Sequence, residues 1–313
     1  MLNPQPALAT AGMPDGALVE AIVQLAREAS IEINVQDVAD LEPSRALLAA
    51  GTKVYVSHLP RQSWLATETA CRAVRAAGLR PVPHLPVRLV AHASELDSVL
   101  DRLVAGARVD EVLLVAGDYA TAAGPYSMVA DVLATGALEK HGFKTVSMAG
   151  HPEGHPKVSL DEVRRAEREK VTLATQAGLD VNLVTQFFFE HTPFLDWVGD
   201  LRAQGVRARF VGGVAGPARP ATLLKFAMRC GVGPSIRALT ARPSSFMHLL
   251  GDHGPEHVVR GLAEARSSGA AEFGGIHLFG FGGYLRTCEW LSRVASGNFR
   301  LSGKGGFEVG AAA

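Results

Sequence analysis

Short apolar runs alternate with amphipathic segments along most of this 313-residue chain. Most of the runs are continuously apolar, which is typical of parallel strands that are buried on both faces of a sheet. The eight runs cover residues 31–35, 53–57, 81–85, 111–116, 144–148, 183–189, 208–214 and 276–281. The pattern therefore predicts eight buried strands.

The segments between these runs have helical periodicity, and several end at glycine, which is preferred just past a helix C-terminus. The predicted helices cover residues 63–77, 94–105, 126–140, 160–177, 194–204, 221–230 and 256–268, and the glycines are Gly78, Gly142, Gly178 and Gly205. A further helix at 15–29 precedes the first strand, and we expect it to close the bottom of the fold. A strand and a helix repeated eight times predict an α/β fold, the (β/α)8 TIM barrel, with a doubly wound open sheet as the alternative.

We expect one domain, because no linker divides the chain. The barrel is predicted over residues 15–301, flanked by a mobile N-terminus at 1–14 and a mobile Gly/Ala-rich tail at 302–313. A long connection, residues 216–274, precedes the last strand and holds an extra helix and a Pro/Ser-rich loop at 242–245.

Composition excludes several classes of partner. The chain is 47% hydrophobic and 20% charged, and its 31 basic residues balance its 31 acidic ones, so neither nucleic acid nor a membrane surface is an expected partner. Cys71, Cys230 and Cys288 lack Cys-x-x-Cys spacing and are predicted to be reduced thiols. No apolar run is long enough to span a membrane and no secretory signal is present, so a cytoplasmic location is expected.

The first strand carries Glu32 inside an apolar run, Ser-Ile-Glu-Ile-Asn. A carboxylate in such a place must either be paired or have its pKa raised by desolvation. A raised pKa would make Glu32 a proton donor near neutral pH, which is the property of a general acid. A salt-bridged structural glutamate is the alternative.

Polar residues or glycine also stand at the ends of the next five strands, where barrel enzymes hold their active sites. They are Ser57 and His58, His84, Gly117 and Asp118, then His151, Glu153 and His155, and Gln186. The loop His-Pro-Glu-Gly-His-Pro at 151–156 is predicted to be stiff and to present imidazoles, with a solvated surface turn as the alternative. Three phenylalanines at 187–189 predict an apolar wall suited to a flat heteroaromatic ligand.

Other kinds of site fit the sequence less well. Histidines at strand ends can bind zinc or iron, but the first strand lacks the usual His-x-His pair, so no metal is expected. Neither a Gly-x-Ser-x-Gly motif nor a strand-end cysteine is present, which argues against nucleophilic hydrolysis. The glycines at 280–283 could approach a phosphate but lack the Walker lysine pattern.

The order of these motifs resembles the methylenetetrahydrofolate reductase family over about residues 30 to 295. The resemblance rests on Glu32, Pro83-His84-Leu85, Gly117-Asp118, His-Pro-Glu-Gly-His-Pro at 151–156 and Thr-Gln-Phe-Phe-Phe-Glu at 185–190, of which the last two are the specific ones. It implies a TIM barrel with non-covalent FAD, which passes hydride from NADH or NADPH to 5,10-methylenetetrahydrofolate and gives 5-methyltetrahydrofolate.

The resemblance also implies roles for single residues. Glu32 matches the acid that assists opening of the methylene bridge, and Asp118 matches an aspartate near both flavin and folate. Gln186 matches the folate-contacting glutamine, with Phe189, Thr222 and Phe226 in the same substrate-binding region. The implied cofactor-binding residues are Ser57, His58, His84, Gly117, Asp118, His151, Glu153 and His155, with Arg168 and Lys170 as candidates for the phosphates.

Several positions depart from the family pattern. Ala116 replaces an arginine before Gly-Asp, His151 replaces a tyrosine, and Thr222 replaces a glutamine. Residues 281–283, Phe-Gly-Gly, stand where Leu-Asn-Arg is usual. These changes leave the electron donor and the direction of the reaction open, and oxidation of 5-methyltetrahydrofolate in one-carbon catabolism is one reading.

Two alternatives remain at the level of sequence. One is another flavin-dependent barrel oxidoreductase similar to proline dehydrogenase, and the other is a folate-binding one-carbon transfer protein without flavin. A tetrahydrofolate derivative is the expected partner, as substrate, and a homo-oligomer is the expected assembly.

Overall fold

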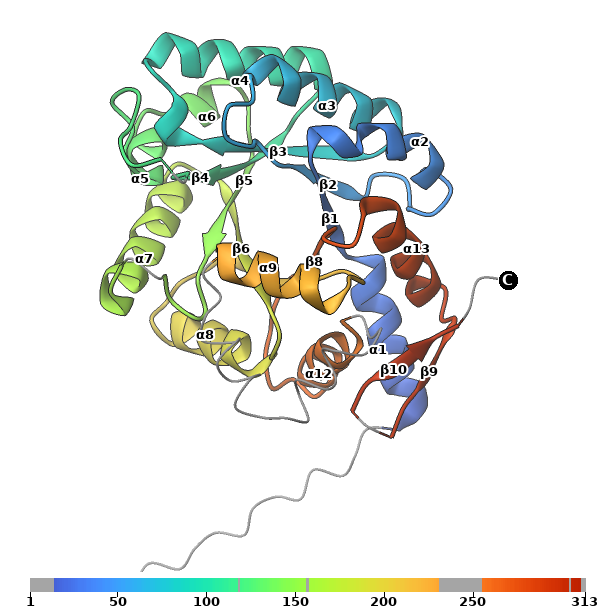
Figure 1. The fold of residues 1–313 in the computed structure, drawn as a ribbon. Helices are drawn as coiled ribbons and strands as arrows, with labels where there is room; N and C mark the ends of the chain where they lie inside the picture. The colour runs from blue at the N-terminus through green and yellow to red at the C-terminus, as the bar shows by residue number, and fades with distance from the viewer. Residues whose placement is uncertain (1–13, 118, 156–157, 231–254, 304, 311–313) are drawn as a thin grey trace, which may run out of the picture.

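A computed structural model describes residues 14–117, 119–155, 158–230, 255–303 and 305–310. Eight parallel strands form a closed barrel in sequence order, with β1 pairing β8, so the predicted (β/α)8 fold is confirmed (Figure 1). The strands are β1 Ser30–Ile33, β2 Lys53–Val56, β3 Arg80–Pro86, β4 Glu111–Val115, β5 Thr145–Gly150, β6 Asp180–Phe188, β7 Arg209–Ala215 and β8 Gly275–Phe279. Closure removes both edges of the sheet and brings all eight strand ends to one mouth.

Helices surround the barrel. They are α1 Asp15–Arg27, α2 Leu41–Ser44, α3 Trp64–Ala76, α4 Ala93–Ala107, α5 Val129–Leu133, α6 Ala137–Lys140, α7 Leu160–Gln176, α8 Thr192–Ala203, α9 Pro220–Cys230, α12 Glu256–Ser267 and α13 Tyr284–Ala295, with short 3-10 turns η1 Val35–Asp40 and η2 Val87–Leu89. The glycines predicted to follow helices have φ between 76° and 81°, a conformation that other residues rarely adopt. The predicted helix at 126–140 is instead two short helices, because Gly136 at φ 67° interrupts it.

The first helix does not close the bottom of the barrel as expected. Helix α1 packs against α12 and α13, the helices that flank β8. Only its C-terminal end, Arg27 and the following Glu28, reaches the cavity of about 260 Å³ at the strand starts. Its apolar face, which includes Leu18, Ile22 and Leu25, is therefore buried sideways in the outer helix layer.

One apolar core lies between the strands and the surrounding helices, and a separate, smaller one lies inside the barrel. Val54 and Val56 of β2 belong to the large core between strands and helices, whereas Tyr55 between them belongs to a small cluster with Val82, Leu113, Val184 and Val211. Successive side chains of a strand point to opposite faces, so this small cluster fills the barrel interior. The continuous apolar runs of the sequence reflect burial on both faces.

Glu111, the first residue of β4, is the centre of a buried polar network at the starts of the strands. Its carboxylate lies 2.7 Å from the Lys53 Nζ and accepts hydrogen bonds from Ser147 Oγ at 2.7 Å and Asn182 Nδ2 at 2.8 Å. Arg80 and the Tyr55 hydroxyl lie farther away, at 3.6 and 3.4 Å. The network joins β2, β3, β4, β5 and β6, so the fully buried charge is paired and hydrogen-bonded.

The ordered structure extends beyond residue 301, so the prediction of a mobile tail from 302 is wrong for its described part. Phe299–Leu301 (β9) and Phe307–Val309 (β10) form an antiparallel hairpin. Phe307 is buried and contacts the rings of Trp290 and Phe299. The predicted mobile N-terminus up to residue 13 and the loop at 242–245 lie outside the described residues.

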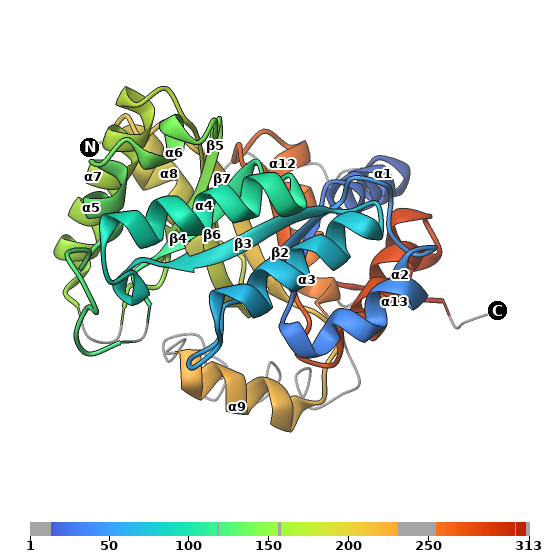
Figure 2. The ribbon, with the colours of Figure 1, turned by 90° about the horizontal axis from the view of Figure 1, so that it is seen from above.

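Helix α9 lies across the end of the barrel at which the strands finish (Figures 1 and 2). Leu223 and Ala227 on its inner side belong to one apolar cluster with Phe187 and Phe279 of the barrel strands, whereas Met228 is exposed. Among the described helices, none has the length and apolar character needed to cross a membrane. Helix α9 therefore borders the same mouth at which the candidate site residues were predicted.

Candidate functional site

Glu32 lies near the end of β1 with its carboxylate between two imidazoles. Its Oε2 is 3.3 Å from His84 Nε2 of β3 and 3.7 Å from His277 Nε2 of β8. The Glu32 side chain is one-fifth exposed at 20%, whereas His277 is 1% exposed. Ser30 and Glu32 point the same way because they are two residues apart on one strand.

The two imidazoles determine the charge of Glu32. Burial acts to raise the pKa of this carboxyl, but His277 and His84 outweigh it and hold the pKa of Glu32 well below its usual value. The prediction of a raised pKa for Glu32 is therefore wrong, because desolvation does not act alone. Glu32 is a paired, ionised carboxylate at neutral pH.

The end of β2 places Ser57 and His58 at the same mouth, and both are buried. His58 Nδ1 is 2.8 Å from Thr67 Oγ1 and its ring packs on Trp64 with centroids 4.4 Å apart. Burial lowers the pKa of His58. The His58 Nε2 is buried without a hydrogen-bond partner among the described residues, whereas the His84 Nε2 faces Glu32. A buried polar atom without a partner is costly unless another group satisfies it, so the His58 Nε2 is a candidate for a ligand contact.

The end of β4 brings the backbone close to its neighbours. Gly117 has φ 90°, and a Cβ there would lie 2.9 Å from the Tyr119 ring and 3.1 Å from Pro86 Cβ. Glycine is therefore required by both conformation and space. The next residue, Asp118, lies outside the described residues, so its predicted role stays a prediction.

Helix α7 ties down the loop that follows β5. The buried Glu167 accepts a hydrogen bond from the His151 N–H at 2.7 Å and another from Trp197 Nε1 at 3.1 Å. Arg164 donates to the carbonyls of His151 and Pro152 at 2.9 and 3.0 Å. The start of the loop is thus held by side chains of α7. The hydrogen bonds from His151 and Trp197 and the nearby Arg164 lower the pKa of Glu167 against the opposing effect of burial.

The two histidines of this loop face each other edge to face, with the His151 and His155 ring centroids 5.8 Å apart. His151 is partly buried and His155 is exposed. Glu153 lies between them and is partly buried. All three residues lie in the loop that follows β5, as predicted.

Arg168 and Lys170, the two residues predicted to bind cofactor phosphates, are hydrogen-bonded to protein groups. Lys170 is buried, and its Nζ donates to the Ala149 carbonyl at the end of β5. Arg168 donates to Gln204 Oε1 at 2.6 Å, at the end of α8. The structure therefore does not gather Arg168 with the mouth residues, and Lys170 lies beneath the loop with its ammonium group already bonded. Burial lowers the pKa of Lys170 to about 8, although Glu167 opposes that shift.

A β-bulge at Thr185 and Gln186 interrupts the pairing of β6 with β7. Thr185 Oγ1 accepts the Gly213 N–H at 2.8 Å, and Gln186 Oε1 accepts the Phe187 N–H at 3.1 Å. A Cβ on Gly213 would lie 2.5 Å from the Thr185 carbonyl oxygen, so glycine is needed opposite the bulge. Bulges often re-aim a side chain next to a binding site, and here the bulge sets the position of Gln186.

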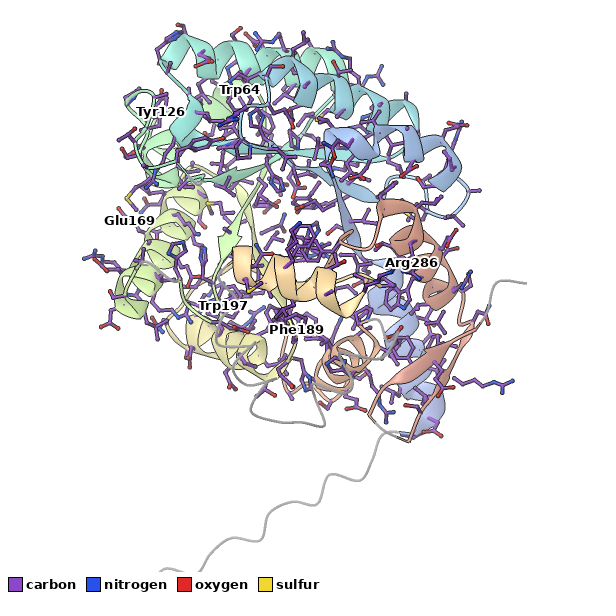
Figure 3. The ribbon with its side chains drawn as sticks, viewed as in Figure 1. Trp64, Tyr126, Glu169, Phe189, Trp197 and Arg286 are labelled. Carbon is purple, nitrogen blue, oxygen red and sulfur yellow. The ribbon has the colours of Figure 1, made fainter. Side chains whose placement is uncertain are left out.

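Phenylalanines from β6, β8, the loop after β8 and α9 form one cluster at the mouth. Phe281 stacks on Phe226 with centroids 4.2 Å apart and on Phe279 at 5.4 Å, and Phe187 meets it edge to face at 4.8 Å. Phe189, labelled in Figure 3, packs edge to face on Phe187 at 5.6 Å and belongs to one apolar cluster with Leu223 of α9. Phe187 and Phe189 belong to this cluster, whereas Phe188 stacks on Phe194 in the large core between strands and helices, so two of the three phenylalanines predicted to form the wall do so. The partly buried Thr222 lies on the same helix as Phe226.

Two residues of this site were missed by sequence reasoning. His277 stands in the eighth apolar run, Gly-Ile-His-Leu-Phe, where a lone polar residue in a doubly buried strand is the same signal that identified Glu32. Glu167 shares the inner face of α7 with Val163, Lys170 and Val171, so helical spacing identifies it as a buried carboxylate.

Comparison with known proteins adds little. No family model matches the chain. A solved structure, of a conserved protein of unknown function from Enterococcus faecalis, matches 61% of this chain and 49% of its own length at 10% identity, with a TM-score of 0.35. The chain thus spans about half the length of that protein, and the likeness carries no argument about function.

Proposed function

We propose that this protein is an oxidoreductase that interconverts 5,10-methylenetetrahydrofolate and 5-methyltetrahydrofolate at the mouth of the barrel. The observation that carries the proposal is the Glu32 carboxylate, held beside His84 at 3.3 Å. It lies at the barrel end that also bears Gln186 and the phenylalanine cluster. A proton-transfer group, an amide and a stacking surface are what a pterin ring and its one-carbon bridge require.

The ionised state of Glu32 suits the oxidative direction of this reaction. When 5-methyltetrahydrofolate loses hydride from its methyl group, N10 attacks the resulting carbon and gives up its proton. A carboxylate at that position can accept the proton, and the same group in its protonated form returns it in the reductive direction. The proposed role of Glu32 is therefore that of a proton carrier whose charge depends on the bound ligand.

The described residues fit the ring of a flavin better than the diphosphate of FAD. A flavin would supply the hydride carrier, and the unpaired His58 Nε2 with Gly117 offers contacts for a planar heteroaromatic ring. The two candidates for the diphosphate do not fit, because Lys170 donates to the Ala149 carbonyl at the end of β5 and Arg168 donates to Gln204. FAD, with NADH or NADPH as donor, accordingly stays a proposal from the family resemblance.

The same arrangement of basic side chains favours a second candidate function, which is not that of an oxidoreductase. A folate-binding one-carbon transfer protein without flavin needs the stacking surface and Gln186 but no diphosphate site. The hydrogen bonds of Lys170 to the Ala149 carbonyl and of Arg168 to Gln204 support this second candidate.

An absorbance spectrum of the purified protein separates the two candidates. We expect a band at about 450 nm, the usual flavin absorption, that bleaches when 5-methyltetrahydrofolate is added without oxygen. Bleaching by NADH or NADPH would identify the electron donor. A protein that remains colourless after incubation with FAD and still binds folate would overturn the oxidoreductase and leave the transfer protein.

Replacement of Glu32 tests its role directly. We expect Glu32→Gln to lower folate turnover by about 10²- to 10⁴-fold, the scale of a general acid or base, while leaving reduction of the flavin by its donor intact. Glu42→Gln is the matched control, because that carboxylate is 80% exposed on α2. Unchanged turnover in Glu32→Gln would make Glu32 a structural residue.

A further inference from the structure

His277 is held from both sides inside the barrel. Its Nδ1 lies 2.9 Å from Ser30 Oγ, and its Nε2 faces Glu32 Oε2 at 3.7 Å. The rings of Tyr55 and Phe279 pack edge-on against the imidazole, with centroids 4.6 and 4.8 Å away. Ser30 pairs with His277 across the β1–β8 ladder, so the strand register itself sets the contact.

The two contacts are linked through the tautomer of His277. A neutral imidazole carries a proton on one ring nitrogen and a lone pair on the other. When Glu32 is ionised, the favourable arrangement has Nε2–H facing the carboxylate, so that Nδ1 accepts from the Ser30 hydroxyl. When Glu32 is protonated, the opposite tautomer suits both partners, because a serine hydroxyl can donate or accept. The pair can therefore support Glu32 in either charge state.

Other ionisable groups also face Glu32. His84 lies beside it on β3, and Asp37 of η1 is near enough for Glu32 to contribute to the raised pKa of Asp37, a shift due mainly to burial. Asp37 already accepts a hydrogen bond from the Asn34 N–H at 2.9 Å. Burial lowers the pKa of His277, which leaves this ring neutral and able to change tautomer. Among these neighbours, His277 is the one whose other ring nitrogen, Nδ1, is hydrogen-bonded to a hydroxyl, that of Ser30.

We propose that Ser30 and His277 are positioning residues for Glu32, with the imidazole orienting the carboxylate for proton transfer and the hydroxyl setting the tautomer of the imidazole. The inference rests on the proposed function for the reaction that the proton transfer serves. The geometry of the pair is a property of the ligand-free protein and can be tested without that reaction.

Nitrogen NMR of ¹⁵N-histidine-labelled, ligand-free protein gives the first test, because protonated and unprotonated ring nitrogens have distinct shifts. At pH 8 we expect His277 with a proton on Nε2 and none on Nδ1, and we expect Ser30→Ala to lose this single-tautomer signature. A proton on Nδ1 at pH 8, or a Ser30→Ala spectrum identical to that of the wild type, overturns the proposal. This test holds even if the wild type shows no folate turnover, which would overturn the proposed function alone.

Two substitutions of His277 give the second test. The amide of His277→Gln can reach the place of Nε2 beside Glu32, whereas that of His277→Asn can reach only the place of Nδ1. We expect His277→Asn to lower kcat by about ten- to a hundredfold, the cost of misplacing a reacting group, and to move the pH profile of kcat, with His277→Gln recovering most of the loss. Leu278→Val, on the same strand but facing the outer core, is the control for stability and should keep the wild-type pH profile. Equal losses in both His277 variants with an unmoved pH profile overturn the proposal.

Discussion

Substitution of Gly213 by alanine should disturb the site through the bulge of β6. The added Cβ would lie 2.5 Å from the Thr185 carbonyl oxygen and 2.6 Å from that of Gln186. Because carbon and carbonyl oxygen ordinarily approach to about 3.3 Å, the end of β6 must move by roughly 0.8 Å. Both contacts are backbone atoms in a closed barrel, so no flexible side chain can absorb the shift.

The cost follows from packing. Forcing a core backbone apart typically costs about 1–3 kcal/mol, and the lower entropy of the unfolded alanine chain offsets less than about 1 kcal/mol of that. We expect Gly213→Ala to lower the free energy of unfolding by about 1–2 kcal/mol. The displacement also carries Gln186, and a shift of this size should lower kcat/KM for the folate substrate by about ten- to a hundredfold.

Urea unfolding and steady-state turnover measure the two effects, with Gly199→Ala as the matched control. Gly199 lies in α8, and a Cβ there meets nothing within 4 Å. That substitution should stabilise the protein by about 0.5–1 kcal/mol and leave turnover unchanged, because alanine favours a helix. A Gly213→Ala protein as stable as the wild type, with the same kcat/KM, would refute the reasoning that the bulge requires glycine.

Three further predictions concern the same region. Thr185→Val should cost about 1–3 kcal/mol in urea unfolding, because it leaves the buried Gly213 N–H without its acceptor, whereas Thr185→Ser keeps that oxygen and should stay near the wild type; equal losses would argue against this bond. Lys170 has a pKa of about 8 in the folded protein and about 10.4 when unfolded, so the unfolded chain binds more protons between these values and the stability contributed by Lys170 rises with pH there. Unfolding free energies from pH 8 to 10 should therefore rise more steeply in the wild type than in Lys170→Met, and parallel curves would contradict the shift. Fluorescence titration should give dissociation constants for FMN and FAD within about tenfold of each other, because Arg168 and Lys170 donate to protein groups and not to a diphosphate. A dissociation constant for FAD about a hundredfold lower than that for FMN would show that these two side chains bind the diphosphate instead.

The barrel could be predicted from the sequence because burial on both faces of a parallel strand leaves a simple signature. Eight apolar runs and the glycines after the helices, such as Gly78 and Gly178, were enough to define it. The hairpin of β9 and β10 could not be predicted in the same way. Its strands are three residues each, and the anchoring of Phe307 on Trp290 depends on packing between distant segments.

The candidate site was predicted in part. Strand ends meet at one mouth in any such barrel, so Glu32, His84 and Gln186 could be placed together before their contacts were known. The charge state of Glu32 could not, because it depends on His277, which lies 245 residues later and approaches through the β1–β8 pairing. The direction in which Arg168 and Lys170 point was also beyond sequence, since long side chains of one helix reach different partners.

The Glu111 network has a consequence for engineering this barrel. Its hydrogen bonds and ion pairs link five neighbouring strands at the end of the barrel away from Glu32, Gln186 and the aromatic cluster. Loops grafted at the mouth to accept a new ligand would therefore leave this network intact. The reverse holds for substitutions of Glu111, which would leave Lys53 and Asn182 without their buried partner and loosen several strands at once.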